Sequence, residues 1–470
     1  MITTRTRLDP SVFDLPVEKM RAGWYTDAYF NHTRAALLEN GRHPQVVMQV
    51  FQKKHAYLGG MDEAIAILKL CSEDWDALEV HALHDGDRIE PWETVMTIEG
   101  DYTLFAHLET VYLGVLARRT LISTNTERVL RAAAGKPIIF MPARHDHHRV
   151  QTGDGYAAYV AGVMLGREIG VTSDAQASWW GGRGVGTVPH ALIAAYDGDR
   201  IEPYEPVLHI SGDYTSFAHL ETPMLGTLAR RTLITTNVVG VLEAANGKPL
   251  IFMPARHDHH RVQTGDGYAA YVAGQIVGAE IGVTTDEQAS WWGGRGIGTV
   301  PHALIAAYGG DTVLAARKFA EWAPPEMNVT VLVDFENDSV RTALAVADAL
   351  GDRLWGVRLD TSESLVDRSL WDEMGDFKPT GVNERLVWKV RDALDARGYE
   401  RLRIVASGGF TAEKISSFEE QGVPVDAYGV GSSLIRGSND FTGDIVITDG
   451  KPSAKIGRHY RENARLERVT

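Results

Sequence analysis

The chain has 470 residues, 44% of them hydrophobic, and its 47 basic and 62 acidic side chains give a formal net charge of −15. This length predicts two or three folding units with a sizeable core, and the negative charge argues against nucleic acid or an anionic membrane as partner. The single cysteine, Cys71, excludes an intrachain disulfide. The N-terminal segment lacks the apolar core of a signal peptide, and no run of about 18 apolar residues is present. We therefore expect a soluble cytoplasmic protein.

Before residue 110 the elements are mixed. Residues 23–41 predict a helix with Asp27 as a possible N-cap, 46–52 a strand, 61–71 a helix, and 85–102 a turn followed by a strand. Together they indicate a small α/β or α+β domain.

An internal repeat dominates the middle of the chain. Asp85–Tyr196 is followed without a linker by Asp197–Tyr308, and equivalent positions lie 112 residues apart. Each copy predicts a long helix (108–133 in the first) and then a buried strand with a polar exit (138–148).

After residue 308 apolar strands alternate with amphipathic helices. The strands are expected within 329–338, 354–364, 403–410 and 425–433, with helices at 312–322, 339–351, 383–398 and 411–422. Such alternation indicates parallel βα units, and polar or glycine residues gather at the strand exits as on the active face of a (β/α) barrel.

Three of these exits carry candidate site residues. Asp360, with Arg358 and Thr361, can hold ribose hydroxyls or a magnesium-bound phosphate, although a solvated acid paired with Arg358 would show the same pattern. The glycine turns on the next two strands can close backbone N–H groups on a phosphate, although glycine turns are common. Their residues are Ser407, Gly408, Gly409, Gly429, Gly431 and Ser432.

The repeat contributes further candidates, each present twice. Arg256 and its twin Arg144 open an Arg-His-Asp-His-His-Arg run. Strand alternation would place His257 and His259 on one face as the start of a metal site, whereas the arginines favour an anion, and a structural polar loop is the third alternative. His302 and its twin His190 end a Gly-Thr-Val-Pro-His motif, where a structural role is the usual one. The preceding glycines lack the Gly-Lys-Ser/Thr ending of a P-loop.

Taken in order, five motifs resemble nicotinate phosphoribosyltransferases, of the type II phosphoribosyltransferase family. They are Thr26-Asp27-Ala28-Tyr29, Gly298-Thr299-Val300-Pro301-His302, Arg358-Leu359-Asp360-Thr361, Ser407-Gly408-Gly409 and Gly429-Val430-Gly431-Ser432. The resemblance implies an irregular α/β barrel, an N-terminal α/β domain made of discontinuous segments, and a homodimer with active sites between subunits. It also implies that nicotinate and phosphoribosyl pyrophosphate are joined to give nicotinate mononucleotide and pyrophosphate for NAD synthesis, with Mg²⁺ and with ATP as co-substrate.

The resemblance assigns roles to individual residues. His302 (or His190) matches a histidine that is transiently phosphorylated, Tyr29 an aromatic that stacks on the pyridine ring, and Asp360 the ribose-side acid. The two glycine turns match the 5′-phosphate site, and Arg256 corresponds to a substrate-binding arginine, although its local sequence departs from the more usual arginine pair. The remaining substrate-binding candidates are Asp27, Arg144, Arg358 and Thr361, and no metal ligand is assigned among the protein residues.

The resemblance to this family does not explain the duplication. We expect an N-terminal α/β domain (1–110), a first copy that is largely an insertion (111–196), a second copy that enters the barrel (197–308), and the second half of the barrel with a tail (309–470). The reverse assignment of the two copies is an alternative. So are an inactive binding or structural descendant, a related enzyme using quinolinate or nicotinamide, and a metal-dependent barrel enzyme built on His257 and His259.

Overall fold

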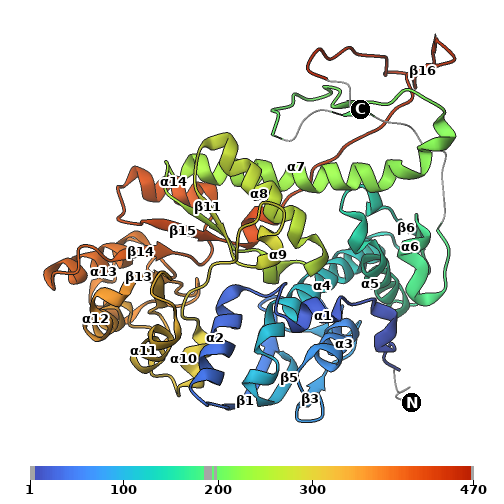
Figure 1. Ribbon diagram of the computed structural model, residues 1–470. Helices are drawn as coiled ribbons and strands as arrows, with labels where there is room; N and C mark the ends of the chain where they lie inside the picture. Colours follow the sequence, from blue (N-terminus) through green and yellow to red (C-terminus); the bar gives the residue numbers. More distant parts are fainter. Residues whose placement is uncertain (1–5, 185–192, 195–197, 467–470) are drawn as a thin grey trace.

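The computed structural model describes residues 6–184, 193–194 and 198–466. An N-terminal domain, a lobe formed by the first copy, and a parallel sheet with its helices make up the molecule (Figure 1). None of the described helices combines the length and apolar character that crossing a lipid bilayer requires.

The N-terminal domain is built on a three-stranded antiparallel sheet in the order β1-β5-β3. Its strands are β1 (Gln45–Phe51), β2 (Ala56–Tyr57), β3 (Glu79–Ala82), β4 (Arg88–Ile89) and β5 (Thr94–Asp101), and its helices are α1 (Val17–Arg21), α2 (Ala28–Glu39) and α3 (Met61–Cys71). The start of the first copy therefore completes this sheet, because β5 pairs with both β1 and β3. The buried face of α3, with Ile67 and Leu68 fully enclosed, covers the core of this domain.

The first copy forms a lobe of its own beside this domain. It contains α4 (Glu109–Ala132), β6 (Ile138–Phe140), α5 (Gln151–Met164), β7 (Ile169–Val171) and α6 (Asp174–Ala177), and a short β8 (Ile193–Ala194) follows. In the described part of the chain, β6 pairs only with β7. The expected buried strand is wrong for this copy, since Ile139 and Met141 are about half exposed where a second neighbouring strand would cover them.

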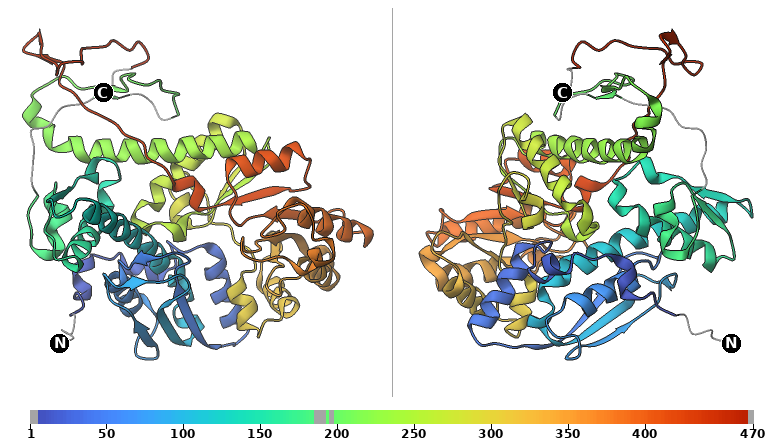
Figure 2. Two further views of the ribbon diagram at one scale, coloured as in Figure 1. Left: turned by 180° about the vertical axis from the view of Figure 1, so that it is seen from behind. Right: turned by 45° about the vertical axis from the view of Figure 1, so that its right-hand side comes forward.

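The second copy enters the main sheet. Its elements are β9 (Leu208–His209), α7 (Glu221–Ala244), β10 (Leu250–Phe252), α8 (Gln263–Val277), β11 (Ile281–Val283), α9 (Asp286–Ala289) and α10 (His302–Ala307). The strand β10 pairs in parallel with β11 on one side and with β15 on the other. The long helix α7 extends from the sheet over the lobe of the first copy (Figures 1 and 2).

The rest of the chain adds four βα-type units to this sheet. They comprise α11 (Thr312–Trp322), β12 (Val329–Leu332), α12 (Ser339–Leu350), β13 (Leu354–Leu359), α13 (Glu384–Ala396), β14 (Arg403–Ala406), α14 (Ala412–Glu420) and β15 (Ala427–Val430), followed by a β16–β17 hairpin (Ile447–Thr448 and Lys451–Pro452). The strands β12 and β15 are fully buried, as expected for a parallel sheet covered on both faces.

The main sheet is parallel and runs in the order β11-β10-β15-β14-β13-β12. Val300 extends it beyond β12 through a parallel bridge to Val331. Among the described residues its two edges do not join, so the sheet is a curled half-barrel. The predicted mixed α/β fold class is thus confirmed, with an open rather than a closed barrel.

Candidate active site

The candidate residues of the barrel half lie along one edge of the main sheet. The strands β10, β15, β14 and β13 are neighbours and parallel, so their C-terminal ends meet there. Arg256 follows β10, and Ser407, Gly408 and Gly409 follow β14. Gly431 and Ser432 follow β15, which contains Gly429, and Asp360 and Thr361 follow β13, which contains Arg358. Fold topology alone therefore brings distant motifs to a single edge, where ligands bind in open α/β sheets.

Asp360 is held at this edge by a buried network. Arg358 Nη2 lies 3.2 Å from Asp360 Oδ2, and Arg358 Nε donates to the Ser407 hydroxyl at 2.8 Å. The same hydroxyl lies 2.8 Å from Asp360 Oδ1. Arg358 is only 5% exposed, so this arginine is a structural residue that holds Asp360 in place. The Asp360 side chain is 19% exposed, so its carboxylate still reaches solvent.

The glycines are required where the backbone is tightly enclosed. Gly408 has φ +88°, and a Cβ there would lie 3.2 Å from Asp360 Oδ1. At Gly409, with φ +70°, a Cβ would overlap Glu363 Oε1. Gly431 faces the carbonyl of Met253, 3.0 Å from where its Cβ would stand. Left-handed backbone favours glycine at Gly408 and Gly409, and the lack of a side chain at all three positions leaves the backbone groups accessible to a ligand.

The N-terminal domain inserts Asp27 and Tyr29 into the second copy. The Ala28 N–H donates to the carbonyl of Thr284 at 2.6 Å, and a Cβ on Gly298 would be 2.6 Å from the Tyr29 nitrogen. Tyr29 donates its hydroxyl to Asp27 Oδ2 at 3.1 Å. Asp27 occupies the predicted N-cap position of α2, but its carboxylate accepts from Tyr29 and Thr110 instead of capping the helix.

Arg256 is the central cation among the site residues at this edge of the sheet. The pKa of its guanidinium is raised above the usual value because the groups around it outweigh the effect of burial. In order of effect, those groups are Tyr29, Asp27, Glu109 and Asp360. Within the described ranges Arg256 nevertheless forms no ion pair, so its donors are available to a ligand.

Glu109 is a site residue that the sequence reasoning missed. It begins α4, accepts a hydrogen bond from the Tyr102 hydroxyl at 3.1 Å, and its pKa is raised to about 7 by burial, which the charge of Arg256 only partly opposes. The available signal was its repetition, since a Leu-Glu-Thr triplet occurs at 108–110 and again at 220–222.

His302 lies at the start of α10, beside the end of β12. Its Nε2 lies 2.8 Å from Asp334 Oδ1, and the imidazole is 44% exposed while Asp334 is 8% exposed. Asp334 was also missed, although it lies in the range 329–338 that was expected to hold a strand with a polar exit. The pair has the geometry of a carboxylate that orients an imidazole, and no hydrogen bond to the other ring nitrogen occurs in the described part of the chain.

Two of the predicted site residues, Arg144 and His190, are not among the residues placed at this edge of the sheet. Arg144 is exposed and next to His145, which pairs with Asp440, and His190 lies outside the described residues. The expectation that His257 and His259 share a strand face is wrong, because the strand ends at Phe252 and 255–257 form a 3₁₀ turn. His259 is fully buried and bound to Glu63 at 2.8 Å.

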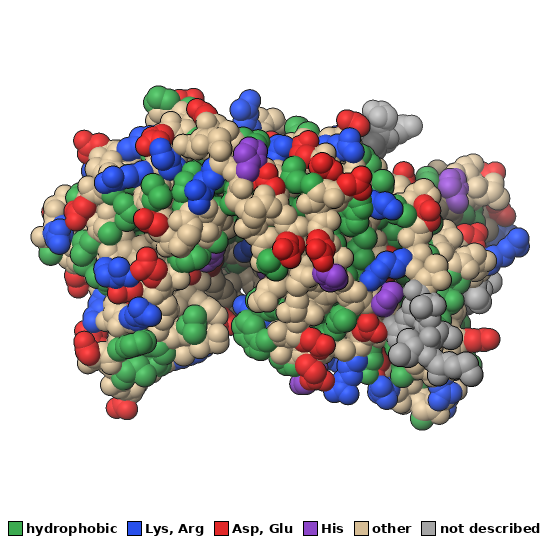
Figure 3. Space-filling view, turned by 90° about the horizontal axis from the view of Figure 1, so that it is seen from below, with side chains coloured by type: hydrophobic (Ala, Val, Ile, Leu, Met, Phe, Trp, Pro, Cys, Tyr) green, Lys and Arg blue, Asp and Glu red, His purple; other side chains and the backbone are tan. Residues whose placement is uncertain are grey.

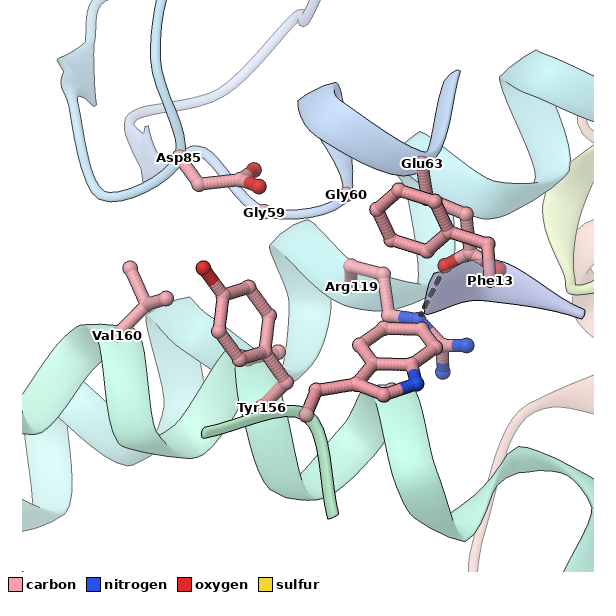
Figure 4. Close-up of a pocket in the computed structure, with 11 residues that line it drawn as sticks. Phe13, Gly59, Gly60, Glu63, Asp85, Arg119, Tyr156 and Val160 are labelled. Carbon is pink, nitrogen blue, oxygen red and sulfur yellow. Dashed lines mark hydrogen bonds and ion pairs between the residues drawn. The ribbon is translucent and has the colours of Figure 1, made fainter. Parts of the chain in front are cut away.

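A separate pocket lies between the N-terminal domain and the first copy (Figure 4). Asp85, Glu63, Arg119 and Tyr156 line it, and Arg119 is turned toward Glu63. Its free volume of ≈ 10 Å³ admits about one water molecule, which is too little for a nucleotide. Seen from below, acidic and basic side chains are interspersed and the surface is hollowed near its middle (Figure 3).

Comparison with known proteins agrees with the motifs. A family model described as the N-terminal domain of quinolinate phosphoribosyl transferase matches residues 27–120 and 187–232, which include the start of each copy. A nicotinate phosphoribosyltransferase of Mycobacterium tuberculosis is 32% identical over 276 residues, covering 57% of this chain and 55% of the relative. A nicotinate phosphoribosyltransferase of Bacillus subtilis is 24% identical over 241 residues, covering 51% and 44%.

Among solved structures, a putative nicotinate phosphoribosyltransferase from Saccharomyces cerevisiae is 12% identical, covers 98% of this chain and 97% of its own, and has a TM-score of 0.45. The chain spans about half the length of the curated relatives that it matches. The sequence matches confirm the resemblance to the type II phosphoribosyltransferase family. Within it, the curated relatives of this chain are nicotinate phosphoribosyltransferases.

Proposed function

We propose that this chain is a nicotinate phosphoribosyltransferase, which joins nicotinate to phosphoribosyl pyrophosphate and releases nicotinate mononucleotide and pyrophosphate. The observation that carries the proposal is Arg256, a guanidinium without an ion pair among the described residues, between Tyr29 and the Asp360 edge of the sheet. Nicotinate needs an aromatic neighbour and one cation, and Tyr29, which is 5% exposed, and Arg256 are the candidates for these two roles.

The site favours one carboxylate on the pyridine ring. A guanidinium binds a carboxylate through two parallel hydrogen bonds, which selects the acid over the uncharged amide. Arg358, the other arginine of the group, is already bound to Asp360 and Ser407. Because only Arg256 remains free, the second carboxylate of quinolinate would lack a partner within the group.

The phosphoribosyl part fits the glycine turns and the end of β13. The hydroxyl of Thr361 is buried and has no hydrogen-bond partner in the described part of the chain, and buried polar groups rarely stay unpaired. A sugar or phosphate oxygen would satisfy it. As the pyridine nitrogen bonds to the anomeric carbon, the bond to pyrophosphate breaks and its electron pair leaves with pyrophosphate. Asp360 is placed to stabilise the positive charge that develops on the ribose.

Mg²⁺ would enter with phosphoribosyl pyrophosphate. The described residues contain no group of three or more His, Cys, Asp or Glu side chains that could hold a metal ion. Mg²⁺ commonly keeps water and substrate phosphates as ligands and takes only one or two carboxylates, so Asp360 is a sufficient protein ligand. The ion would neutralise the leaving pyrophosphate.

ATP would act through His302. The imidazole Nε2 contacts Asp334, which leaves the other nitrogen free to accept the γ-phosphoryl group of ATP, with ADP as the leaving group. The homodimer that the resemblance implies is not part of this proposal. The two copies of the repeat already contact each other within one chain, which favours a monomer.

The test is an assay of the purified chain with phosphoribosyl pyrophosphate, Mg²⁺ and either nicotinate, nicotinamide or quinolinate, with and without ATP. We expect nicotinate mononucleotide as the main product and a higher rate with ATP. Absence of product from nicotinate under both conditions would contradict the proposal. Substrate binding without turnover would support the inactive descendant.

A further inference from the structure

The two copies of the repeat contact each other through a charge network that is unchanged when they are exchanged. Arg118 of the first copy pairs with Asp146 of its own copy at 2.6 Å and with Asp258 of the second at 3.0 Å. Arg230 of the second copy pairs with Asp258 of its own copy at 2.8 Å and with Asp146 of the first at 3.1 Å. Both arginines are nearly inaccessible, with 7% and 6% of their side chains exposed.

The backbone contacts between the copies are likewise unchanged when the two copies are exchanged. The helix α4 packs on the 3₁₀ turn Ala255–His257 of the second copy, and α7 packs on the equivalent turn Pro142–Arg144 of the first. A Cβ on Gly114 would lie 2.2 Å from the Asp258 carbonyl oxygen, and one on Gly226 would lie 2.0 Å from that of Asp146. A contact in which i meets j and j meets i is the isologous contact of a two-fold dimer. Here it lies within one polypeptide.

The single N-terminal domain bridges the copies on one side of this contact. Glu63 Oε2 lies 3.1 Å from Arg119 Nε of the first copy, and Glu63 Oε1 lies 2.8 Å from His259 Nε2 of the second. Phe13 packs edge-on against Trp179 of the first copy, and its carbonyl accepts from Arg261 of the second at 2.9 Å.

The equivalent positions on the other side are open. Arg231, the mate of Arg119, keeps its pair with Asp266, but no described acid takes the place of Glu63. Trp291, the mate of Trp179, is 58% exposed. Two equivalent docking faces therefore exist, and the one N-terminal domain fills only one of them.

The sequences of the copies differ where this asymmetry requires it. Glu287 of the second copy accepts hydrogen bonds from the Trp24 indole and the Thr264 hydroxyl, and Lys19 lies 3.5 Å away. The equivalent residue of the first copy is Ala175. The side chain that fastens the N-terminal domain is thus present on the docking face that this domain fills and is replaced by alanine at the equivalent position of the open face.

We propose that the first copy takes the place of a second subunit, so that one chain contains a complete two-fold interface and a single active site formed by the N-terminal domain and the second copy. The chain then works as a monomer. The assignment of the active site rests on the proposed function, whereas the assembly rests only on the contacts between the copies.

The mass of the purified full chain in solution tests the assembly without reference to activity. Light scattering during size-exclusion chromatography at micromolar concentration should give the monomer mass of 51.6 kDa. A stable dimer of twice that mass would overturn the proposal, whether or not the chain is active.

Co-expression of two differently tagged, singly inactive chains tests the location of the site. One carries Tyr29→Ala in the N-terminal domain and the other Asp360→Asn at the sheet edge. If each site forms within one chain, the mixture stays inactive. Recovery of about a quarter of the parent activity, as expected for random pairing of chains with shared sites, would overturn the proposal. An inactive parent chain would contradict the proposed function alone, and the mass measurement would still decide the assembly.

Discussion

The Nε2 atom of His302 lies 2.8 Å from Oδ1 of Asp334, in a site where the imidazole is partly exposed and the carboxylate is buried. A buried carboxylate fixes the orientation and tautomer of an imidazole. The pair is therefore suited to carry a phosphoryl group transiently.

We expect His302→Ala to abolish both the stimulation by ATP and the ATP-dependent labelling of the protein by a base-stable, acid-labile phosphoryl group. Asp334→Asn should lower the stimulation by at least about tenfold, since the ring loses its charged partner. Mass spectrometry at alkaline pH and the ATP dependence of the rate measure the two effects. His190→Ala is the matched control, and equal losses from His190→Ala and His302→Ala would contradict a single-copy site.

The glycine turn after β14 should respond differently from a glycine of similar conformation elsewhere. Gly408 (φ +88°) faces Asp360, whereas a Cβ on Gly422 (φ +63°) would meet no atom within 4 Å. Alanine at either position should cost roughly 1 kcal/mol of folding stability through its left-handed backbone. Only Gly408→Ala should raise the KM for phosphoribosyl pyrophosphate. An equal rise from Gly422→Ala would show that the effect is not local.

Glu109 should make stability fall as the pH rises. Its pKa in the folded protein, about 7, lies above the ordinary 4.5, first because of burial. Between these values the folded state holds a proton that the unfolded state has lost, so the free energy of unfolding decreases with pH, by about 3 kcal/mol at most. Glu109→Gln removes this penalty.

Thermal unfolding from pH 4 to 8 measures this effect. The Gln variant should match the parent chain near pH 4 and exceed it near pH 8. The exposed Glu99→Gln variant should follow the parent throughout. A Gln variant that is less stable than the parent at pH 8 would mean that the charged carboxylate is stabilising, contrary to the pKa shift.

The network between the copies should make Arg118 and Arg230 equally important for stability. Alanine at either position leaves buried carboxylates without their partner, at a cost of about 3–5 kcal/mol, which thermal unfolding would show as a lower Tm. Arg341→Ala removes surface ion pairs with Glu336 and Asp338 and should change little. If Arg118→Ala is silent while Arg230→Ala destabilises, the first copy does not dock on the second.

Much of the fold could be predicted from periodicity. The strand at Leu354–Leu359 and the helix Ala28–Glu39 lie within their expected ranges because local pattern and burial agree there. By contrast, the equivalent strands β6 and β10 of the two copies are only three residues long, and histidines after Phe252 lie in 3₁₀ turns. Whether a short apolar run is a strand depends on neighbours elsewhere in the chain, and sequence alone does not show them.

The residues of the candidate site could also be predicted only in part. Asp360 and the glycine turns could be expected because each follows a buried strand directly. Glu109 could not be assigned from the sequence, since its chemistry arises from burial beside Arg256, which is far away along the chain. The asymmetry between Arg256 and Arg144 was likewise invisible, because their local sequences are identical and only the surroundings differ.

That asymmetry gives the most direct test of the account. Arg256→Ala should lower kcat/KM for nicotinate by about 100-fold or more, the effect of removing one partner of a buried charged pair, while Arg144→Ala leaves it within about twofold. The measurement is the rate of nicotinate mononucleotide formation by the two variants beside the parent chain. Equal losses, or a loss confined to Arg144→Ala, would contradict a single site built on the second copy.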